Sequence, residues 1–223
     1  SHLVTQRQKG SISSPSPILI NTYMITDYSP GGILCQMPED LLTLLKRKLD
    51  ELEKTVFPNF PQGECAPGEG YKQWKIQVPK MPLLPGQYRV GEILENVLRY
   101  KELQPVINFF EQHVDSVFKF RLSTLCPEDD LRPHGNHMFP RIHIPLNETD
   151  FSFSLEDKLN DNEVKHIKIE YGNVYFINVS SSHWGKINEG SGKRNNALFS
   201  FNRFNDPELN KKFKIDEYFT DKY

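Results

Sequence analysis

The sequence predicts a mainly β, α+β fold: a β-sandwich or jelly roll supported by N-terminal helices. Two observations carry this prediction. Helical spacing of apolar residues is confined to the first half of the chain, and from Ser116 onward the period changes to two. Short apolar runs separated by polar or glycine-containing turns then follow one another, which is typical of antiparallel sheets that pack face to face.

The chain is expected to form one domain behind a short tail. Residues 1–17 are polar and rich in Ser, Gln and Pro, a composition typical of disorder. The single domain is expected to span 18–223, with helical support at about 38–115 and a jelly-roll core at about 116–204. Residues 18–28 have β character, and no internal repeat is present.

Two helical segments are expected in the N-terminal half. The first begins at Pro38 and an acidic pair, because proline suits the first helical turn and acidic residues suit the positive end of the helix dipole. Its apolar residues continue at helical spacing to Val56. A short strand is expected at 73–78 within a loop-rich stretch, and a second helical stretch begins near Gly91 and is broken or restarted at Pro105.

The second half is expected to supply the sheets. The predicted strands lie at 117–122, 141–146, 151–155, 164–170, 173–179 and 196–202. Near the end of the chain, Lys211 and Lys212 are balanced by acidic residues and are expected to belong to a solvated tail.

Composition narrows the class of protein. At 223 residues and 26.0 kDa the chain can bury one substantial core. A net charge of −2 and a pI near 6.4 provide no basic field to attract nucleic acid or anionic membrane. Cys35, Cys65 and Cys126 form no CxxC pair and fit a reducing compartment, and no apolar run approaches the roughly 20 residues that span a bilayer. These features favour a cytoplasmic protein without nucleic-acid or membrane partners.

Two histidines are the main candidates for a metal site. His134 lies at the end of the segment that leads out of 126–132, and His183 is expected at the end of the apolar strand 174–177. A redox metal that must bind both O₂ and a co-substrate needs few protein ligands, all on one face. Two histidines and one carboxylate are the usual protein solution for non-haem Fe(II). The pattern therefore predicts a metal at the β core.

Three cationic or polar residues indicate an anion beside that metal. Arg141 and His143 alternate on one strand and therefore point to the same face. Burying them is costly unless an anion meets the charge. Arg194, just before the strand 196–201, could hold another carboxylate, because a planar guanidinium pairs with a carboxylate through two contacts.

The order and spacing of these elements resemble the aspartyl/asparaginyl β-hydroxylase family of Fe(II)/2-oxoglutarate-dependent oxygenases, including its proline-hydroxylase-like branch. The resemblance covers roughly 116–204, and its elements in chain order are Pro133–Asn136, Arg141–His143, Gly172–Phe176 leading to His183, and Arg194. It implies a double-stranded β-helix, the cupin-like jelly roll. It also implies that His134 and His183 bind Fe(II), while Arg141, His143 and Arg194 bind 2-oxoglutarate.

The chain departs from the family pattern at Asn136, where the proline-hydroxylase branch has an aspartate ligand. The asparagine carbonyl could still coordinate the metal, but more weakly than a carboxylate. We therefore expect Asn136→Asp to tighten Fe(II) binding. His137 or a water molecule at the third position are alternatives that the sequence leaves open.

The resemblance implies a dioxygenase that uses O₂ to hydroxylate an amino acid, an amino-acid-derived metabolite or a peptide side chain, releasing succinate and CO₂. Desaturation and halogenation remain open as outcomes of the same chemistry. The candidate substrate-binding residues are Trp74, Arg89, His137 and Trp184.

Two alternative functions stay open. A cupin-type metalloprotein without co-substrate would use His134, His137, His143 and His183, and its metal binding would be indifferent to 2-oxoglutarate and to Arg194. A non-catalytic jelly-roll binding module with a decayed metal site is the other alternative, and the missing aspartate favours it.

Overall fold

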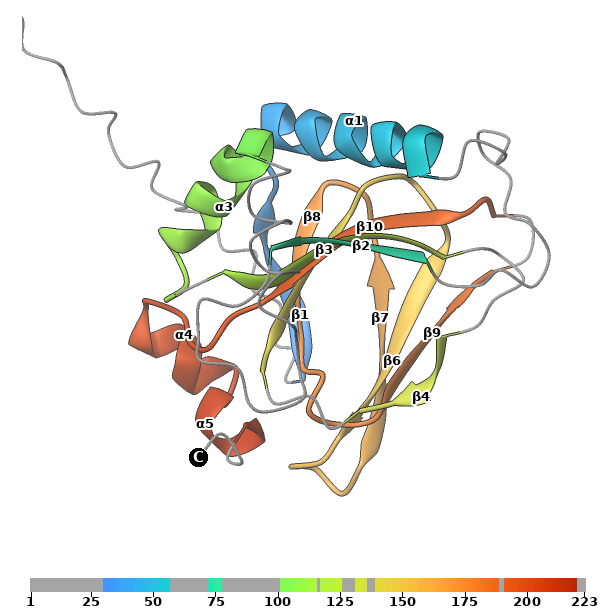
Figure 1. The fold of residues 1–223 in the computed structure, drawn as a ribbon. Coiled ribbons are helices and arrows are strands. Elements are labelled where there is room, and N and C mark those ends of the chain that lie inside the picture. Colours follow the sequence, from blue (N-terminus) through green and yellow to red (C-terminus); the bar gives the residue numbers. More distant parts are fainter. Residues whose placement is uncertain are drawn as a thin grey trace, which may run out of the picture.

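The computed structural model of the protein describes residues 30–56, 72–77, 101–115, 117–125, 131–135, 139–188 and 191–219. Its ten described strands form two antiparallel sheets that face each other as a jelly roll, a double-stranded β-helix (Figure 1). The predicted fold class is therefore confirmed. Within the described residues, no helix combines the length and the apolar character that crossing a membrane requires.

The major sheet has six strands in the order β1-β8-β5-β10-β3-β2, and the minor sheet has four in the order β4-β9-β6-β7. The major strands are β1 (Gly31–Gln36), β2 (Lys72–Gln77), β3 (Phe118–Leu125), β5 (Arg141–Pro145), β8 (Asn173–Ile177) and β10 (Arg194–Ser200). The minor strands are β4 (Leu131–His134), β6 (Phe151–Asp157), β7 (Glu163–Ile169) and β9 (His183–Ile187).

Helices cover the outer face of the major sheet (Figure 1). They are α1 (Glu39–Val56), η1 (Lys101–Leu103), α3 (Gln104–Glu111), α4 (Pro207–Lys212) and α5 (Ile215–Tyr218). The leucine stripe of α1 belongs to the same buried cluster as the outward side chains of the sheet, among them Phe176 of β8 and Phe199 of β10. Each such fully buried side chain contributes about 1.5–3 kcal/mol, so this helix-covered core is a principal source of stability.

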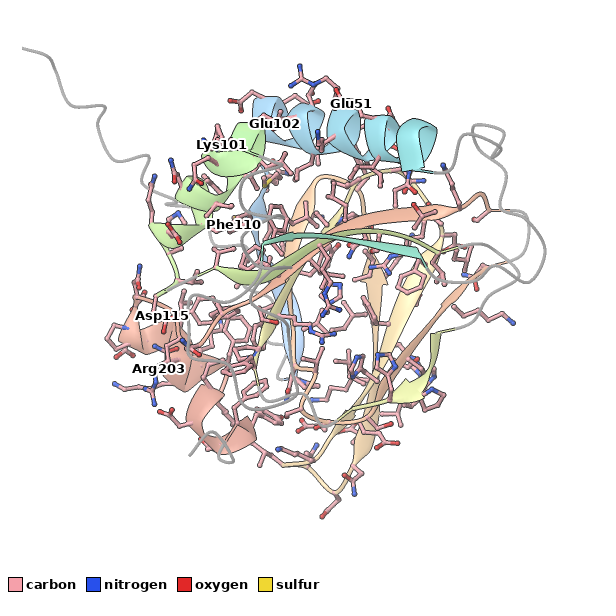
Figure 2. The ribbon with its side chains drawn as sticks, in the orientation of Figure 1. Glu51, Lys101, Glu102, Phe110, Asp115 and Arg203 are labelled. Atoms are coloured by element: carbon pink, nitrogen blue, oxygen red, sulfur yellow. The ribbon has the colours of Figure 1, made fainter. Side chains whose placement is uncertain are left out.

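Polar contacts join the helices to one another and to the connection that follows β10. Lys48 of α1 forms an ion pair with Glu102 of η1, and Figure 2 shows Glu102 on the outer side of the molecule beside α1. Asp115, just after α3, accepts hydrogen bonds from the backbone nitrogens of Asn202 and Arg203 at 3.1 and 3.3 Å. The segment that follows α3 is thereby tied to the connection between β10 and α4.

A second core fills the space between the two sheets. Its apolar members come from facing strands, for example Phe151 and Phe153 of β6, Tyr175 and Ile177 of β8, and Ile187 of β9. Successive side chains of a strand point to opposite faces. The same strands of the major sheet therefore supply one set of residues to the helix-covered core and another to the inter-sheet space.

Most predicted elements are confirmed. The helix from Pro38 to Val56 is present as α1, the short strand at 73–78 as β2, and all six strands of the second half as β3, β5, β6, β7, β8 and β10. The second helix resumes next to Pro105, as expected, but ends at Glu111. Residues 1–17, 18–28 and 91–100 lie outside the described residues.

Two expectations are wrong. The end of the chain is not a solvated tail up to residue 219: α4 and α5 bury Leu209, Phe213, Ile215 and Tyr218 against the helix-covered core, although Lys211 and Lys212 themselves are exposed. His183 does not end the strand that begins at Asn173. That strand stops at Ile177, and His183 opens β9 in the other sheet.

Candidate functional site

The two predicted metal ligands lie side by side. His134 at the end of β4 is paired directly with His183 at the start of β9 in antiparallel register. Directly opposite side chains project to the same face of a sheet, and the two imidazole centroids are 4.2 Å apart, with 52° between the ring planes. His134 is exposed, whereas His183 is 2% exposed. Two imidazoles so placed can bind one metal ion from the edge of the minor sheet.

The protonation of His183 suits metal binding. The Ser181 carbonyl oxygen lies 3.0 Å from its Nδ1. Because a carbonyl oxygen only accepts, Nδ1 carries the proton and the lone pair is on Nε2. Burial, helped by the charges of His134 and Arg141 and opposed by the Ser181 bond, lowers the pKa of His183 to about 4. His183 is therefore neutral at pH 7, as a metal ligand must be.

Gly135 joins the two histidine-bearing segments. A Cβ at this position would lie 2.7 Å from the Ser181 oxygen and 2.9 Å from both the Ser181 carbonyl carbon and the Ser182 nitrogen. The backbone after His134 therefore packs directly on the carbonyl that holds His183. A side chain at residue 135 would disturb both ligands at once.

The described residues bring together two candidate metal ligands, His134 and His183. Within the described residues, no group of three or more His, Cys, Asp or Glu side chains is placed to hold a metal ion. The predicted third-ligand candidates Asn136 and His137 lie outside the described residues. Two imidazoles suit iron, zinc, copper and nickel, so the described donors fit a transition metal without selecting among these.

Arg194 and His143 both contact Phe153 in the inter-sheet space. Arg194, at the start of β10, is 3% exposed, and its guanidinium carbon lies 4.0 Å from the ring centroid of Phe151 and 5.0 Å from that of Phe153. His143 of β5 is 5% exposed and meets the Phe153 ring edge-on at 5.0 Å. Both side chains thus reach from the major sheet toward β6 of the minor sheet. A cation this deep is held at lower cost when an anion lies against it.

Asn196 belongs to the same group, and the sequence analysis missed it. It follows Arg194 by two residues on β10, so its side chain points to the same face. Asn196 is 1% exposed, and its Nδ2 lies 3.3 Å from Nδ1 of His143. Among the described residues its Oδ1 has no hydrogen-bond partner. The sequence carries only a weak signal for it, because Asn195 between Arg194 and Asn196 is polar as well, and the strand assignment is needed to place Asn196 on the face of Arg194.

Arg141 lies at the histidine end of the site. It pairs with Ser200 on β10, six residues from Arg194, which corresponds to about 20 Å along a strand. Its positive charge contributes to lowering the pKa of His183. Arg141 and Arg194 therefore lie at opposite ends of the inter-sheet space, and His143 lies between them.

Of the four candidate substrate-binding residues, the structure describes only the side chain of Trp184. Trp184 follows His183 on β9 and pairs with Ser154, so it points to the opposite, outer face of the minor sheet. The side chain of Trp74, although β2 itself is described, lies outside the described set, as do Arg89 and His137.

Several solved structures have a similar fold. A prolyl-4-hydroxylase from Pseudomonas putida is 14% identical over 75% of this chain and 89% of its own, with a TM-score of 0.42. AviO1 from Streptomyces viridochromogenes Tue57 is 14% identical over 79% and 90%, with a TM-score of 0.44. HygX from Streptomyces hygroscopicus, with nickel and 2-oxoglutarate bound, is 13% identical over 77% and 81%, with a TM-score of 0.47. No protein-family model and no curated protein matches the sequence. Likenesses this distant concern the course of the chain and not its chemistry.

Proposed function

We propose that the protein is an Fe(II)- and 2-oxoglutarate-dependent dioxygenase, of the type represented by the aspartyl/asparaginyl β-hydroxylase family. The observation that carries the proposal is the pairing of His134 with His183, whose rings lie 4.2 Å apart at the end of adjacent strands. The outer hydrogen bond from His183 to Ser181 supports it, because metal-binding histidines usually have such a partner on the second ring nitrogen.

The described residues around the two histidines would have the following places in this function. His134 and His183 would hold the metal, with Asn136, His137 or water completing the protein side. Arg194 would bind the distal carboxylate of 2-oxoglutarate inside the inter-sheet space, helped by His143 and by Arg141, which lies at the histidine end of that space. The bound metal, with 2-oxoglutarate and O₂, supplies the oxidising chemistry that hydroxylates a C–H bond and releases succinate and CO₂.

The proposed substrate is an amino acid, an amino-acid-derived metabolite or a peptide side chain, as the resemblance implies. The proposed compartment is the cytoplasm. Cys35 is a free thiol, which fits a reducing environment, and burial raises its pKa to about 11 and so keeps it unreactive.

The deciding experiment is an anaerobic Fe(II) titration of the full chain with and without 2-oxoglutarate, followed through the charge-transfer band of the chelated complex. We expect the band to require both components and to vanish in His183→Ala. The matched control is His166→Ala, because His166 is an exposed histidine of β7, where it bonds to Ser154. That variant should keep the band.

The same titration separates the two alternatives. Iron binding that ignores 2-oxoglutarate and survives Arg194→Ala unchanged would favour a cupin-type metalloprotein. Absence of stoichiometric iron binding would favour a non-catalytic binding module. With the band established, succinate release in the presence of individual amino acids and peptides identifies the substrate.

A further inference from the structure

Arg194 lies on a floor of two aromatic rings. Its guanidinium carbon is 4.0 Å from the centroid of Phe151 and 5.0 Å from that of Phe153. The two rings contact each other edge to face, with centroids 5.0 Å apart. All three side chains are at least 97% buried. Stacking on an aromatic ring stabilises a desolvated guanidinium and also restrains its position.

The floor itself rests on Gly185. A Cβ at this position would lie 2.3 Å from the tip of the Phe151 ring and 2.9 and 3.2 Å from its neighbouring atoms. Phe151 can therefore lie against the β9 backbone only because residue 185 has no side chain. Facing sheets are about 10 Å apart. The Phe151 ring lies on the β9 backbone, and the Arg194 guanidinium lies on that ring. Together they fill the spacing between the sheets, so packing fixes the position of the guanidinium between them.

Phe153 connects Arg194 to the second candidate anion-binding residue. The same ring that lies under Arg194 meets His143 edge-on at 5.0 Å, and His143 in turn contacts Asn196 through Nδ1. One aromatic side chain thus restrains both polar groups from the side of the minor sheet.

The register between β6 and β9 shows how far the two rings lie from His183 along the strands. His183 is paired with Leu155, Gly185 with Phe153, and Ile187 with Phe151. The two rings therefore lie two and four residues from the level of His183, which is about 7 and 13 Å along the strand. A ligand that contacts the histidines with one end and Arg194 with the other must span the distance that these rings set.

We propose that Phe151 and Phe153, supported by Gly185, are positioning residues that select the carbon-chain length of the 2-oxo dicarboxylic acid by fixing Arg194. The inference rests on the proposed function. Replacing either ring by leucine gives the guanidinium room to move, so the five-carbon acid loses affinity and its advantage over the six-carbon acid declines. A displacement of about 1 Å of a positioned group can cost on the order of a hundredfold in reaction rate, so ligand binding at this contact is expected to be sensitive to the position of Arg194.

The test is the ratio of dissociation constants for 2-oxoglutarate and 2-oxoadipate, measured by calorimetry on the anaerobic Fe(II)-loaded protein. In Phe151→Leu and Phe153→Leu we expect the preference for 2-oxoglutarate to fall roughly tenfold or more. Phe199→Leu is the matched control, because Phe199 is an equally buried phenylalanine of β10 in the helix-covered core. It should lower stability and leave the ratio unchanged.

Two results would overturn the inference, and they are distinguishable. If the wild-type protein binds Fe(II) but neither acid, the proposed function fails and the inference fails with it. If the wild type prefers 2-oxoglutarate and the ratios in Phe151→Leu and Phe153→Leu match that of Phe199→Leu, the proposed function stands and the rings do not select length. Gly185→Ala provides a second perturbation. It is expected to weaken binding of both acids, because the added methyl group would push Phe151 into the space of Arg194.

Discussion

Replacing Gly135 by alanine should weaken metal binding without removing any ligand. The new Cβ would lie 2.7 Å from the Ser181 oxygen, whereas ordinary contact begins at 3.4 Å. The atoms nearest the new Cβ belong to the backbone and not to the end of a flexible side chain, so they cannot simply rotate away. Restoring ordinary contact therefore requires the Ser181 carbonyl to move by about 0.7 Å (3.4 − 2.7). Its hydrogen bond from Nδ1 of His183, now 3.0 Å, would lengthen to as much as about 3.7 Å when the carbonyl moves directly away from the ring, which is beyond the normal range.

The expected loss is about 10- to 100-fold in metal affinity, the usual effect of removing an outer partner of a ligating histidine. The crowding itself should cost about 1–3 kcal/mol in unfolding free energy. Affinity is measured by anaerobic competition with a chromophoric chelator, and stability by urea unfolding of the metal-free protein. Gly192→Ala is the matched control, since nothing lies within 4 Å of a Cβ there.

The outcome that would refute this reasoning is a Gly135→Ala protein with reduced stability and unchanged metal affinity. Crowding would then have been relieved without moving the Ser181 carbonyl, or the orientation of His183 would not depend on it. A loss of affinity in Gly192→Ala of the same size would equally remove the argument, because that substitution touches no part of the site.

Three further predictions concern stability. Because the fold lowers the pKa of His183 to about 4, the unfolded chain binds a proton at this residue at a higher pH than the folded protein does. Urea unfolding of the metal-free protein should therefore show about 2 kcal/mol less stability at pH 5 than at pH 7. The loss between these two pH values should be smaller in His183→Gln. Tyr218→Phe leaves buried Asp157 without its hydroxyl donor and should cost about 1–3 kcal/mol by thermal unfolding; an unchanged melting temperature would show that bond to be dispensable. Ile144→Val in the helix-covered core should cost about 0.5–1.5 kcal/mol with metal affinity unaltered, and a change in that affinity would argue against separate cores.

The sequence predicted α1 and the strands flanking the site because their patterns are strong and local. The strand β9 escaped prediction because its five residues include a glycine and a lysine, which weaken any strand pattern. The structure supplies the reason for the glycine: the Phe151 ring lies on it. That packing joins residues far apart in the chain, so no local pattern carries it.

The C-terminal helices were missed for a different reason. Their charged residues dominate the composition, but a start signal was present: Asp206 is the N-cap of α4, accepts from the backbone nitrogen of Glu208, and precedes Pro207 at the first helical position. Leu209 and Phe213, four residues apart, then share one face and are buried. Cap and stripe together would have identified this helix where charge counting did not.

The candidate site shows most clearly what a sequence leaves undetermined. The histidines could be selected by residue type and order, but their adjacency depends on the register between β4 and β9, and a slip of one residue would turn one imidazole to the outer face. The face of Arg194 is set in the same way. On β10, Ala197 and Phe199 enter the helix-covered core, whereas Arg194 and its alternating neighbours enter the inter-sheet space. Strand alternation thus lets one strand stabilise the fold with one face and carry buried charge on the other, so the apolar packing that fixes the register also fixes the site.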